Sequence, residues 1–254
     1  MAQILNRDTA LFHFLTRIGD STLILGHRVS EWCGHSPMLE EDIALANTAL
    51  DLIGHTRMWL GLAAEVEGKG RSADDLAFLR DSMDFTNLLL VEQPNGDFGQ
   101  TMMRQLLFDA WHLPYLNALK SFPDPRVAGI AEKATKEVAY HVDRAADLVV
   151  RLGDGTHESH TRMQAALDEL WPCVGEMFST DEVDAMLAPD APKPDRIRDA
   201  WDATILPTLA RATLAVPATR FTRQGGKTGR HSEHLGHVLA QMQFLQRAYP
   251  GATW

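Results

Sequence analysis

The sequence predicts an all-α fold in which four long helices form a bundle and further helices follow at the C-terminal end. Three observations support this. Apolar residues recur at helical intervals in four long segments, and these fall into two sequential pairs separated by a long link. No pair of segments alternates with the period of two expected for strands. We expect one domain over residues 1–254, with the core bundle at about 8–153 and appended helices at about 156–250.

The first pair of helices is predicted over about 8–32 and 40–66. In the first, apolar residues at helical intervals include Leu11, Phe14 and Ile18, and "GHSP" ends it. The second begins with three carboxylates, which complement the positive end of a helix dipole, and stops at "EGKG". The following link, "DFTNLLLVEQPNGDF", is long enough that we expect it to pack on the bundle and to carry function.

The second pair of helices is predicted over about 98–122 and 125–152. Pro114 is expected to kink the first of them. Asp124 suits the N-cap of the second, and Pro125 suits its first helical position. Further helices are expected near 158–178, 194–215 and 231–249. This order fits a ferritin-like bundle, which would hold any metal between the inward faces of its first four helices.

Composition excludes several kinds of partner. The 34 acidic and 24 basic residues give a net charge of −10, which repels nucleic acid and anionic membranes. Cys33 and Cys173 form no Cys-x-x-Cys motif and indicate free thiols in a reducing compartment. Residues 1–20 lack a leader pattern, and no run of about 18 apolar residues occurs. We expect a soluble cytoplasmic protein with no nucleic acid or membrane partner.

The helices carry an incomplete pattern for a di-iron site. Such a site takes single carboxylates from two helices and Glu-x-x-His from each of the other two. This chain offers Glu31 and Asp109 as the single carboxylates, and "LIGH" and "VAYH" in place of the pairs. His55 and His141 are therefore present, but Leu52 and Val138 replace the glutamates. Two remaining negative charges would not offset two ferrous ions, so we expect no metal in this chain.

Two alternatives concern the same helices. Asp51 lies four residues before His55, and Glu137 lies four before His141, so a displaced site would use these carboxylates on the same helical faces. Its six ligands would be Glu31, Asp51, His55, Asp109, Glu137 and His141. The other interpretation is that buried carboxylates and histidines hydrogen-bond one another and serve packing alone.

Other histidines and a basic loop also need an interpretation. His112 could be a ligand but is more typical of a satisfied core residue, and "HSEH" at His231 to His234 suits helix capping. The loop "RFTRQGGKTGR" gathers positive charge in an acidic chain, and its adjacent glycines would let backbone amides approach an anion. The loop is either a solvated segment or a contact for an acidic partner or a phosphorylated ligand; the candidates are Arg220, Arg223, Lys227 and Arg230.

Long stretches of this sequence resemble one family closely. They include "LGHRVSEWCGHSPMLEEDIALANTALDLIG", "FTNLLLVEQPNGDF", "DAWH", "KEVAYH", "GGKTGRHSEHLG" and the terminal Trp254. The chain resembles the C subunits of the bacterial phenylacetyl-CoA 1,2-epoxidases, ferritin-like proteins of multicomponent monooxygenases in phenylacetic acid degradation. The resemblance covers nearly the whole chain.

The resemblance implies a function within a complex. A homologous catalytic partner, which we call the di-iron subunit, would hold the di-iron centre. An NADPH-dependent reductase would supply electrons, and the complex would epoxidise the ring of phenylacetyl-CoA. The C subunit would be structural, without a cofactor or catalytic residue of its own, and would stabilise the di-iron subunit. The resemblance also implies six degenerate ligand positions, which are Glu31, Leu52, His55, Asp109, Val138 and His141.

Overall fold

The structure is a computed structural model that describes residues 6–252, and every regular element within that range is a helix. The all-α prediction is therefore confirmed. Trp254 and the first five residues, on which part of the sequence analysis rests, lie outside the described range. No helix of residues 6–252 has both the length and the apolar character needed to cross a membrane.

The chain divides into two compact units. Unit 1 contains the described residues 6–94, 180–189 and 225–252, and unit 2 contains residues 95–179 and 190–224. Both units are assembled from separate parts of the sequence. The expectation of one domain stays a prediction.

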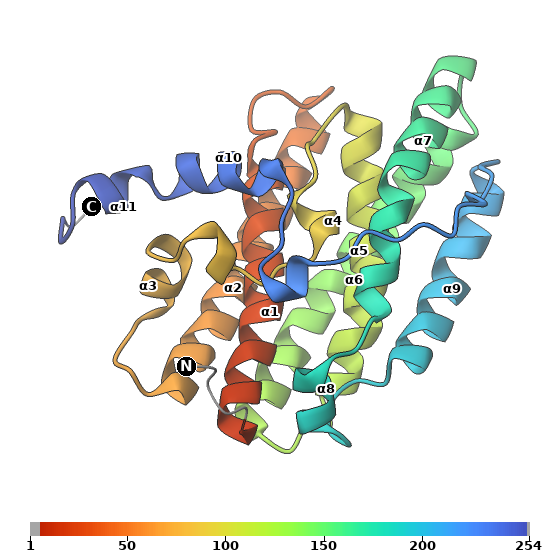
Figure 1. Cartoon of the computed structure of the whole chain (residues 1–254). Coiled ribbons are helices and arrows are strands. Elements are labelled where there is room, and N and C mark those ends of the chain that lie inside the picture. Colours follow the sequence, from red (N-terminus) through yellow and green to blue (C-terminus); the bar gives the residue numbers. More distant parts are fainter. Residues whose placement is uncertain (1–5, 253–254) are drawn as a thin grey trace. The chain divides into compact units, whose positions relative to one another are not determined.

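In unit 1, helices α1 (Arg7–Ser30) and α2 (Leu39–Glu67) lie side by side (Figure 1). The side chain of Asn6 accepts a hydrogen bond from the Thr9 amide and caps α1. A Cβ atom at Gly19 would lie 2.6 Å from Leu60, so glycine permits this close approach. Gly68, with a φ of 66°, ends α2 in the left-handed conformation.

The remaining elements of unit 1 are short. Between α2 and unit 2 the structure has α3 (Ala73–Phe78), η1 (Ser82–Asp84) and α4 (Leu89–Glu92). Later parts of the chain add α8 (Glu182–Leu187), η3 (Gly226–Thr228), α10 (Glu233–Met242) and α11 (Phe244–Ala248). The link predicted to pack on the bundle does so within this unit, because most of its residues from 85 to 93 are buried and α4 contacts α1.

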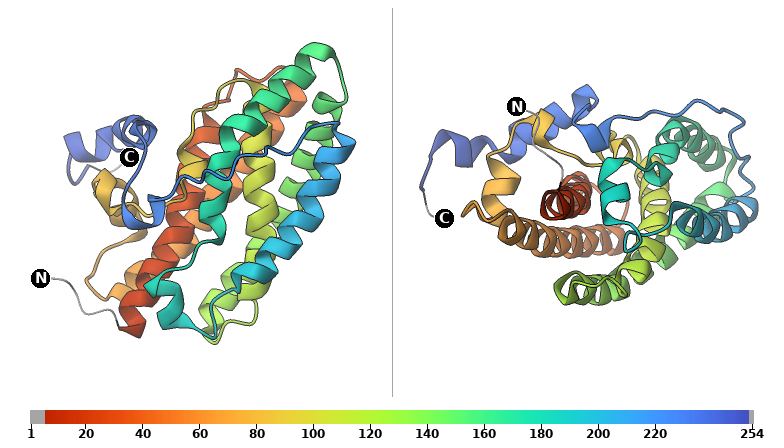
Figure 2. Two further views of the ribbon diagram at one scale, coloured as in Figure 1. Left: turned by 45° about the vertical axis from the view of Figure 1, so that its right-hand side comes forward. Right: turned by 60° about the horizontal axis from the view of Figure 1, so that its bottom comes forward.

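Unit 2 is built on the long helices α5 (Phe98–Leu119) and α6 (Pro125–Gly153), which lie side by side in both views of Figure 2. It also contains α7 (His157–Leu170), η2 (Trp171–Phe178) and α9 (Pro194–Arg211). Asp124 caps α6 by accepting a hydrogen bond from the Arg126 amide, as predicted. Trp201 of α9 donates a hydrogen bond to the Leu107 carbonyl and so fixes α9 on α5.

The structure corrects three predicted boundaries. The helix expected over 158–178 ends at Leu170 and continues as the tighter helix η2, because Pro172 has no amide hydrogen to extend the α-helical bonding. The helix expected over 194–215 ends at Arg211. The helix expected over 231–249 is divided into α10 and α11.

Candidate functional site

Three of the six degenerate ligand positions lie in unit 1. Leu52 and His55 are completely buried on α2, and a Cβ atom at Gly26 of α1 would lie 3.3 Å from the Leu52 Cβ. Leu52 is therefore packed against α1. Glu31 caps the C-terminal end of α1, and its Oε1 atom lies 3.2 Å from Nη1 of Arg28. The carboxylate of Glu31 thus already has a cationic partner from its own helix.

The other three positions lie in unit 2. Asp109 on α5 and Val138 on α6 are completely buried, and His141 on α6 is 2% exposed. Asp109 accepts a hydrogen bond of 2.7 Å from the side-chain amide of Gln105. Burial raises the pKa of Asp109 to about 6, although attraction to His141 and the bond from Gln105 both act to lower it. Asp109 and His141 therefore interact electrostatically within the core of unit 2, and the packing interpretation stays a prediction.

The side chains at these positions do not fit a di-iron centre. Each metal pair needs bridging glutamates, and the positions that would supply them hold the buried hydrocarbon side chains of Leu52 and Val138. The displaced alternative needs Asp51 and Glu137, which are only half-buried. Among residues 6–252, neither unit contains a group of three or more His, Cys, Asp or Glu side chains that could hold a metal ion. The absence of metal from this chain nevertheless stays a prediction.

His112 lies among aromatic rings in unit 2. It is completely buried, with its ring centroid 5.0 Å from that of Phe108 and stacked on Trp111 at 6.1 Å. This packing agrees with its interpretation as a core residue.

Unit 1 contains a buried polar network that the sequence analysis missed. Glu92 of α4 is completely buried and accepts hydrogen bonds at both carboxylate oxygens. Oε1 accepts from the Ser232 amide at 2.6 Å, and Oε2 accepts from His231 Nδ1 at 2.8 Å and from the Asn87 side chain at 3.0 Å. The available signal was a single glutamate at the end of the apolar run "LLLVE".

The same network gives His231 a positive charge. Its Nε2 atom lies 2.9 Å from the carbonyl oxygen of Phe85, while Nδ1 faces the Glu92 carboxylate. With an ionised Glu92 carboxylate, neither acceptor has a hydrogen to donate, so both ring nitrogens donate and the ring is an imidazolium. Burial lowers the pKa of His231, but the hydrogen bonds to Glu92 and Phe85 raise it, and the net pKa lies above the ordinary 6.5.

Residues 225–234, which we call the C-terminal clasp, bind the link and α4 through the backbone as well as through His231. A Cβ atom at Gly226 would lie 2.2 Å from the Asn87 carbonyl oxygen, and one at Gly229 would lie 2.3 Å from that of Met83. Arg28 of α1 donates a hydrogen bond to the Glu92 carbonyl at 3.0 Å. The clasp, α4 and α1 are thereby joined.

Two sequence features of this segment have defined positions in unit 1. "HSEH" lies at the start of α10, as predicted, with Ser232 as the N-cap; the Ser232 side chain makes no capping hydrogen bond, and His231 binds Glu92. The adjacent glycines were expected to let amides approach an anion. In the structure Gly226 is buried against the Asn87 carbonyl, so its lack of a side chain permits contact between two backbone segments.

The four basic candidates do not belong to one unit. Arg220 and Arg223 lie in unit 2 and are exposed, and the Arg223 amide donates to the Pro172 carbonyl at 2.7 Å. Lys227 and Arg230 lie in unit 1, where Arg230 is exposed and Lys227 lines a pocket. Whether any of them touches a partner or coenzyme A stays a prediction.

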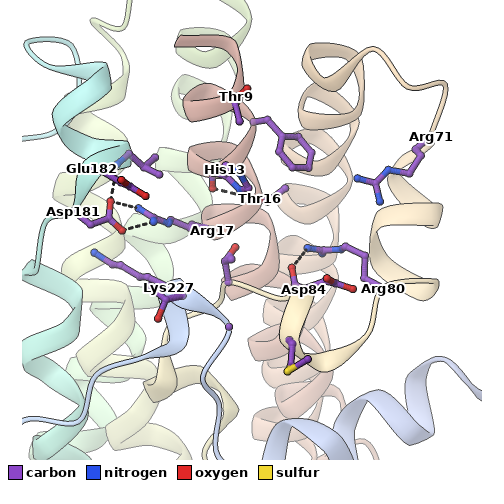
Figure 3. Close-up of a pocket in the computed structure, with 16 residues that line it drawn as sticks. Thr9, His13, Thr16, Arg17, Arg71, Arg80, Asp84, Asp181, Glu182 and Lys227 are labelled. Atoms are coloured by element: carbon purple, nitrogen blue, oxygen red, sulfur yellow. Dashed lines mark hydrogen bonds and ion pairs between the residues drawn. The ribbon is translucent and has the colours of Figure 1, made fainter. Parts of the chain in front are cut away.

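The pocket that Lys227 lines has a volume of about 530 Å³ and lies within unit 1 (Figure 3). Its arginines are paired with carboxylates. Arg17 forms two hydrogen bonds with Asp181, and Arg80 forms two with the buried Asp20. Because these guanidinium groups are already neutralised, the pocket is polar without being a strong anion site.

A family model and a curated relative identify one family, and a solved structure shows the fold. Residues 2–254 match the family described as phenylacetic acid catabolic protein. The chain is 47% identical over 243 residues to the C subunit of the 1,2-phenylacetyl-CoA epoxidase of Escherichia coli (strain K12), and the match covers 95% of this chain and 98% of that protein. A solved structure of a Synechococcus protein with aldehyde deformylating oxidase activity matches 83% of this chain and 95% of its own, with a TM-score of 0.59 and 14% identity. That likeness shows the fold, and the ferritin-like class is confirmed.

Proposed function

Because the chain belongs to the family of phenylacetic acid catabolic proteins, we propose that it is the non-catalytic structural subunit of a multicomponent phenylacetyl-CoA 1,2-epoxidase. Its E. coli relative is the C subunit of that enzyme and is matched over almost its whole length. In the proposed complex, a homologous di-iron subunit performs catalysis, other epoxidase subunits complete the assembly, and a reductase delivers electrons from NADPH. The complex acts on the ring of phenylacetyl-CoA in the cytoplasm.

One observation carries the non-catalytic assignment: Leu52 and Val138 are both 0% exposed at the positions that need bridging glutamates. Of the two remaining carboxylates, Glu31 is paired with Arg28, and the Asp109 carboxyl has a pKa of about 6. The chain therefore offers little negative charge to offset two ferrous ions, and removing metal hydration in a core without such charge is unfavourable.

Metal analysis of the purified proteins tests this assignment. We expect far less than one iron per molecule of this chain, and about two per molecule of the di-iron subunit, which is prepared in parallel as the positive control. We also expect no turnover of phenylacetyl-CoA by this chain with the reductase, and turnover once the di-iron subunit is added. Two tightly bound irons per chain, or turnover by this chain and the reductase alone, would contradict the proposal and favour an independent di-metal oxygenase that uses Asp51 and Glu137.

The basic candidates are proposed as contacts with the di-iron subunit or with the phosphates of coenzyme A. Guanidinium groups bind phosphate and carboxylate oxygens in paired hydrogen bonds. Because the residues divide between the units, two double variants separate their roles: Arg220→Ala with Arg223→Ala, and Lys227→Ala with Arg230→Ala.

A rise in KM with assembly unchanged assigns a pair to substrate, and a weaker complex with KM unchanged assigns it to the partner. Exposed ion pairs contribute only about 0.2–1 kcal/mol each, so the two members of a pair are replaced together. If neither quantity changes for either double variant, the basic residues are solvated and this part of the proposal is refuted.

A further inference from the structure

The chain passes from unit 2 to unit 1 through a long segment without regular structure. Residues 215–224, which we call the strap, follow α9 and precede η3 (Figure 1). Nine of the ten residues are exposed, and Pro217 is half-buried. Exposed connections of this kind are where ligand contacts and proteolytic cleavage concentrate in folded proteins.

The strap is held to unit 2 near both of its ends. At the start, the Ala215 amide donates to the Gln164 side chain at 2.8 Å, and the Gln164 side chain donates back to the Ala215 carbonyl at 2.9 Å. Near the end, the Arg223 amide donates to the Pro172 carbonyl at 2.7 Å. These two anchors leave residues 216–221 between them as a tethered stretch on the surface of unit 2.

Between the anchors the backbone is available to another protein. Among the described residues, the amides and carbonyls of residues 216–221 make no hydrogen bond to other backbone groups. The Phe221 amide donates locally to the Thr219 hydroxyl at 3.2 Å. An endoprotease binds its substrate as an extended strand whose amides and carbonyls pair with the enzyme on both sides of the cleaved bond. Residues 216–221 can be bound in this way without prior unfolding of unit 2.

The strap also carries two arginines that a protease could recognise. Arg220 and Arg223 are exposed, and within residues 6–252 neither guanidinium group has a hydrogen-bond or ion-pair partner. An arginine-specific protease binds such a free guanidinium with a carboxylate in its specificity pocket. Arg220 lies between the anchors, whereas the Arg223 amide is already bonded to Pro172. The bond after Arg220 is therefore the more accessible of the two.

We propose that the strap is a proteolytic modification site, at which an arginine-specific serine endoprotease hydrolyses the peptide bond between Arg220 and Phe221. One water molecule is consumed. Its oxygen joins the carbonyl carbon of Arg220, which becomes a carboxylate, and its two hydrogens join the nitrogen of Phe221, which becomes an ammonium group. The inference goes beyond the proposed function and does not depend on it, because it concerns the chain by itself.

The segment after the cut has its own contacts with unit 1. His231 binds Glu92 at 2.8 Å, and the Gln243 side chain donates to the carbonyls of Ala77 and Arg80 at 3.1 and 3.0 Å. Three buried apolar side chains of α10 add to these bonds: Leu235, Val238 and Leu239. None of these contacts involves the strap. Cleavage should therefore give a nicked protein whose two pieces stay together.

Limited trypsin digestion of the native full chain, followed by mass spectrometry, tests the site. We expect residues 1–220 and 221–254 as the first products. Arg220→Gln should slow the first cut by about tenfold or more, because the remaining arginine is anchored through its amide. The matched control Arg223→Gln removes the neighbouring exposed arginine and should leave the first cut unchanged. A first cut at another bond, or equal effects of the two variants, would overturn the proposed site.

Gel filtration of the nicked protein tests whether the pieces stay together. We expect one peak at the position of the intact chain, with both pieces in equal amounts. Gln243→Ala should release the C-terminal piece about tenfold faster, because it removes the buried bonds to Ala77 and Arg80. The matched control is Gln241→Ala, on the exposed surface of α10, which should behave as the wild type does. Rapid loss of residues 221–254 from the nicked wild type, or equal release from both variants, would overturn the two-piece form.

Discussion

At the scale of single residues, unit 1 and unit 2 each bury an ionisable side chain, and the two respond to pH for different reasons. Asp109 is a carboxyl whose pKa is raised by burial, so its ionisation opposes folding. His231 is an imidazole whose pKa is raised overall by two acceptors, so its charge supports folding. The stability contributed by both groups therefore decreases as pH rises, over different ranges.

Asp109→Asn should stabilise the protein more at pH 8 than at pH 5. The folded carboxyl has a pKa of about 6 against the ordinary 3.8, so its contribution is lost as pH rises through about 6. Asparagine is never charged and keeps an oxygen for the bond from Gln105. The difference in unfolding free energy between variant and wild type should grow by about 1.4 kcal/mol between these pH values. Urea unfolding measures it, and a difference that is constant with pH would show that Asp109 is not the buried acid described here.

His231→Gln should remove a pH-dependent part of the stability of unit 1. Because the folded pKa of His231 lies above 6.5, this contribution is fully present below pH 6.5 and is lost as pH rises through the folded pKa. The wild type should therefore exceed the variant most at pH 6 and least at pH 9. Hydrogen exchange over the C-terminal clasp measures the effect, with His237→Gln on exposed α10 surface as the control. Equal pH profiles for wild type and His231→Gln would contradict the imidazolium assignment.

At the scale of elements, the long helices could be predicted because their own sequences determine them. Asp124 and Pro125 define the start of α6 without reference to any other segment. The short helices α3, α4 and α8 were missed, since four to six residues carry too little periodicity and the burial of α4 depends on distant residues.

The candidate site likewise contains some features that local sequence predicts and others that depend on distant residues. The missing glutamates at Leu52 and Val138 could be read from spacing along single helices, and the structure adds that both side chains are buried. The bond between Glu92 and His231 joins residues 139 positions apart, so no local pattern predicted it. The contact of Gly226 with the Asn87 carbonyl could not be predicted from the sequence, because approach to an anion and approach to a neighbouring backbone both require glycine.

Gly226→Ala should destabilise unit 1 strongly, whereas Gly236→Ala should not. A Cβ at Gly226 would overlap the Asn87 carbonyl oxygen, so the clasp would have to move away from the link. A Cβ at Gly236, on α10, meets no atom within 4 Å. We expect a cost of about 1–3 kcal/mol at Gly226 and a gain of up to about 1 kcal/mol at Gly236, where alanine favours the helix. Thermal unfolding compares the two variants, and equal unfolding temperatures would refute the close backbone contact.

At the scale of the whole molecule, each unit contains one cysteine, and the reaction rate of that thiol measures how exposed it is within its unit. Cys33 is exposed in unit 1, and Cys173 is completely buried in unit 2. The native protein should therefore react quickly with a thiol reagent at one cysteine per chain. Cys173 should react only when unit 2 opens, so its rate should rise steeply with urea. In the variant Cys33→Ser, Cys173 is the remaining thiol, so its reaction can be measured by itself. Rapid reaction of Cys173 in the native protein would contradict the packing around it.

The C-terminal clasp also determines when unit 1 can be completed during synthesis. A ribosome releases Glu92 well before it makes His231, and the sequence of unit 2 emerges in between. Until His231 and Ser232 leave the exit tunnel, the Glu92 carboxylate lacks two of the donors that surround it in the finished protein and has Asn87 alone of the three. The nascent chain must therefore carry an open unit 1 through most of translation, and a stall before residue 231 leaves the link and α4 exposed to chaperones and proteases.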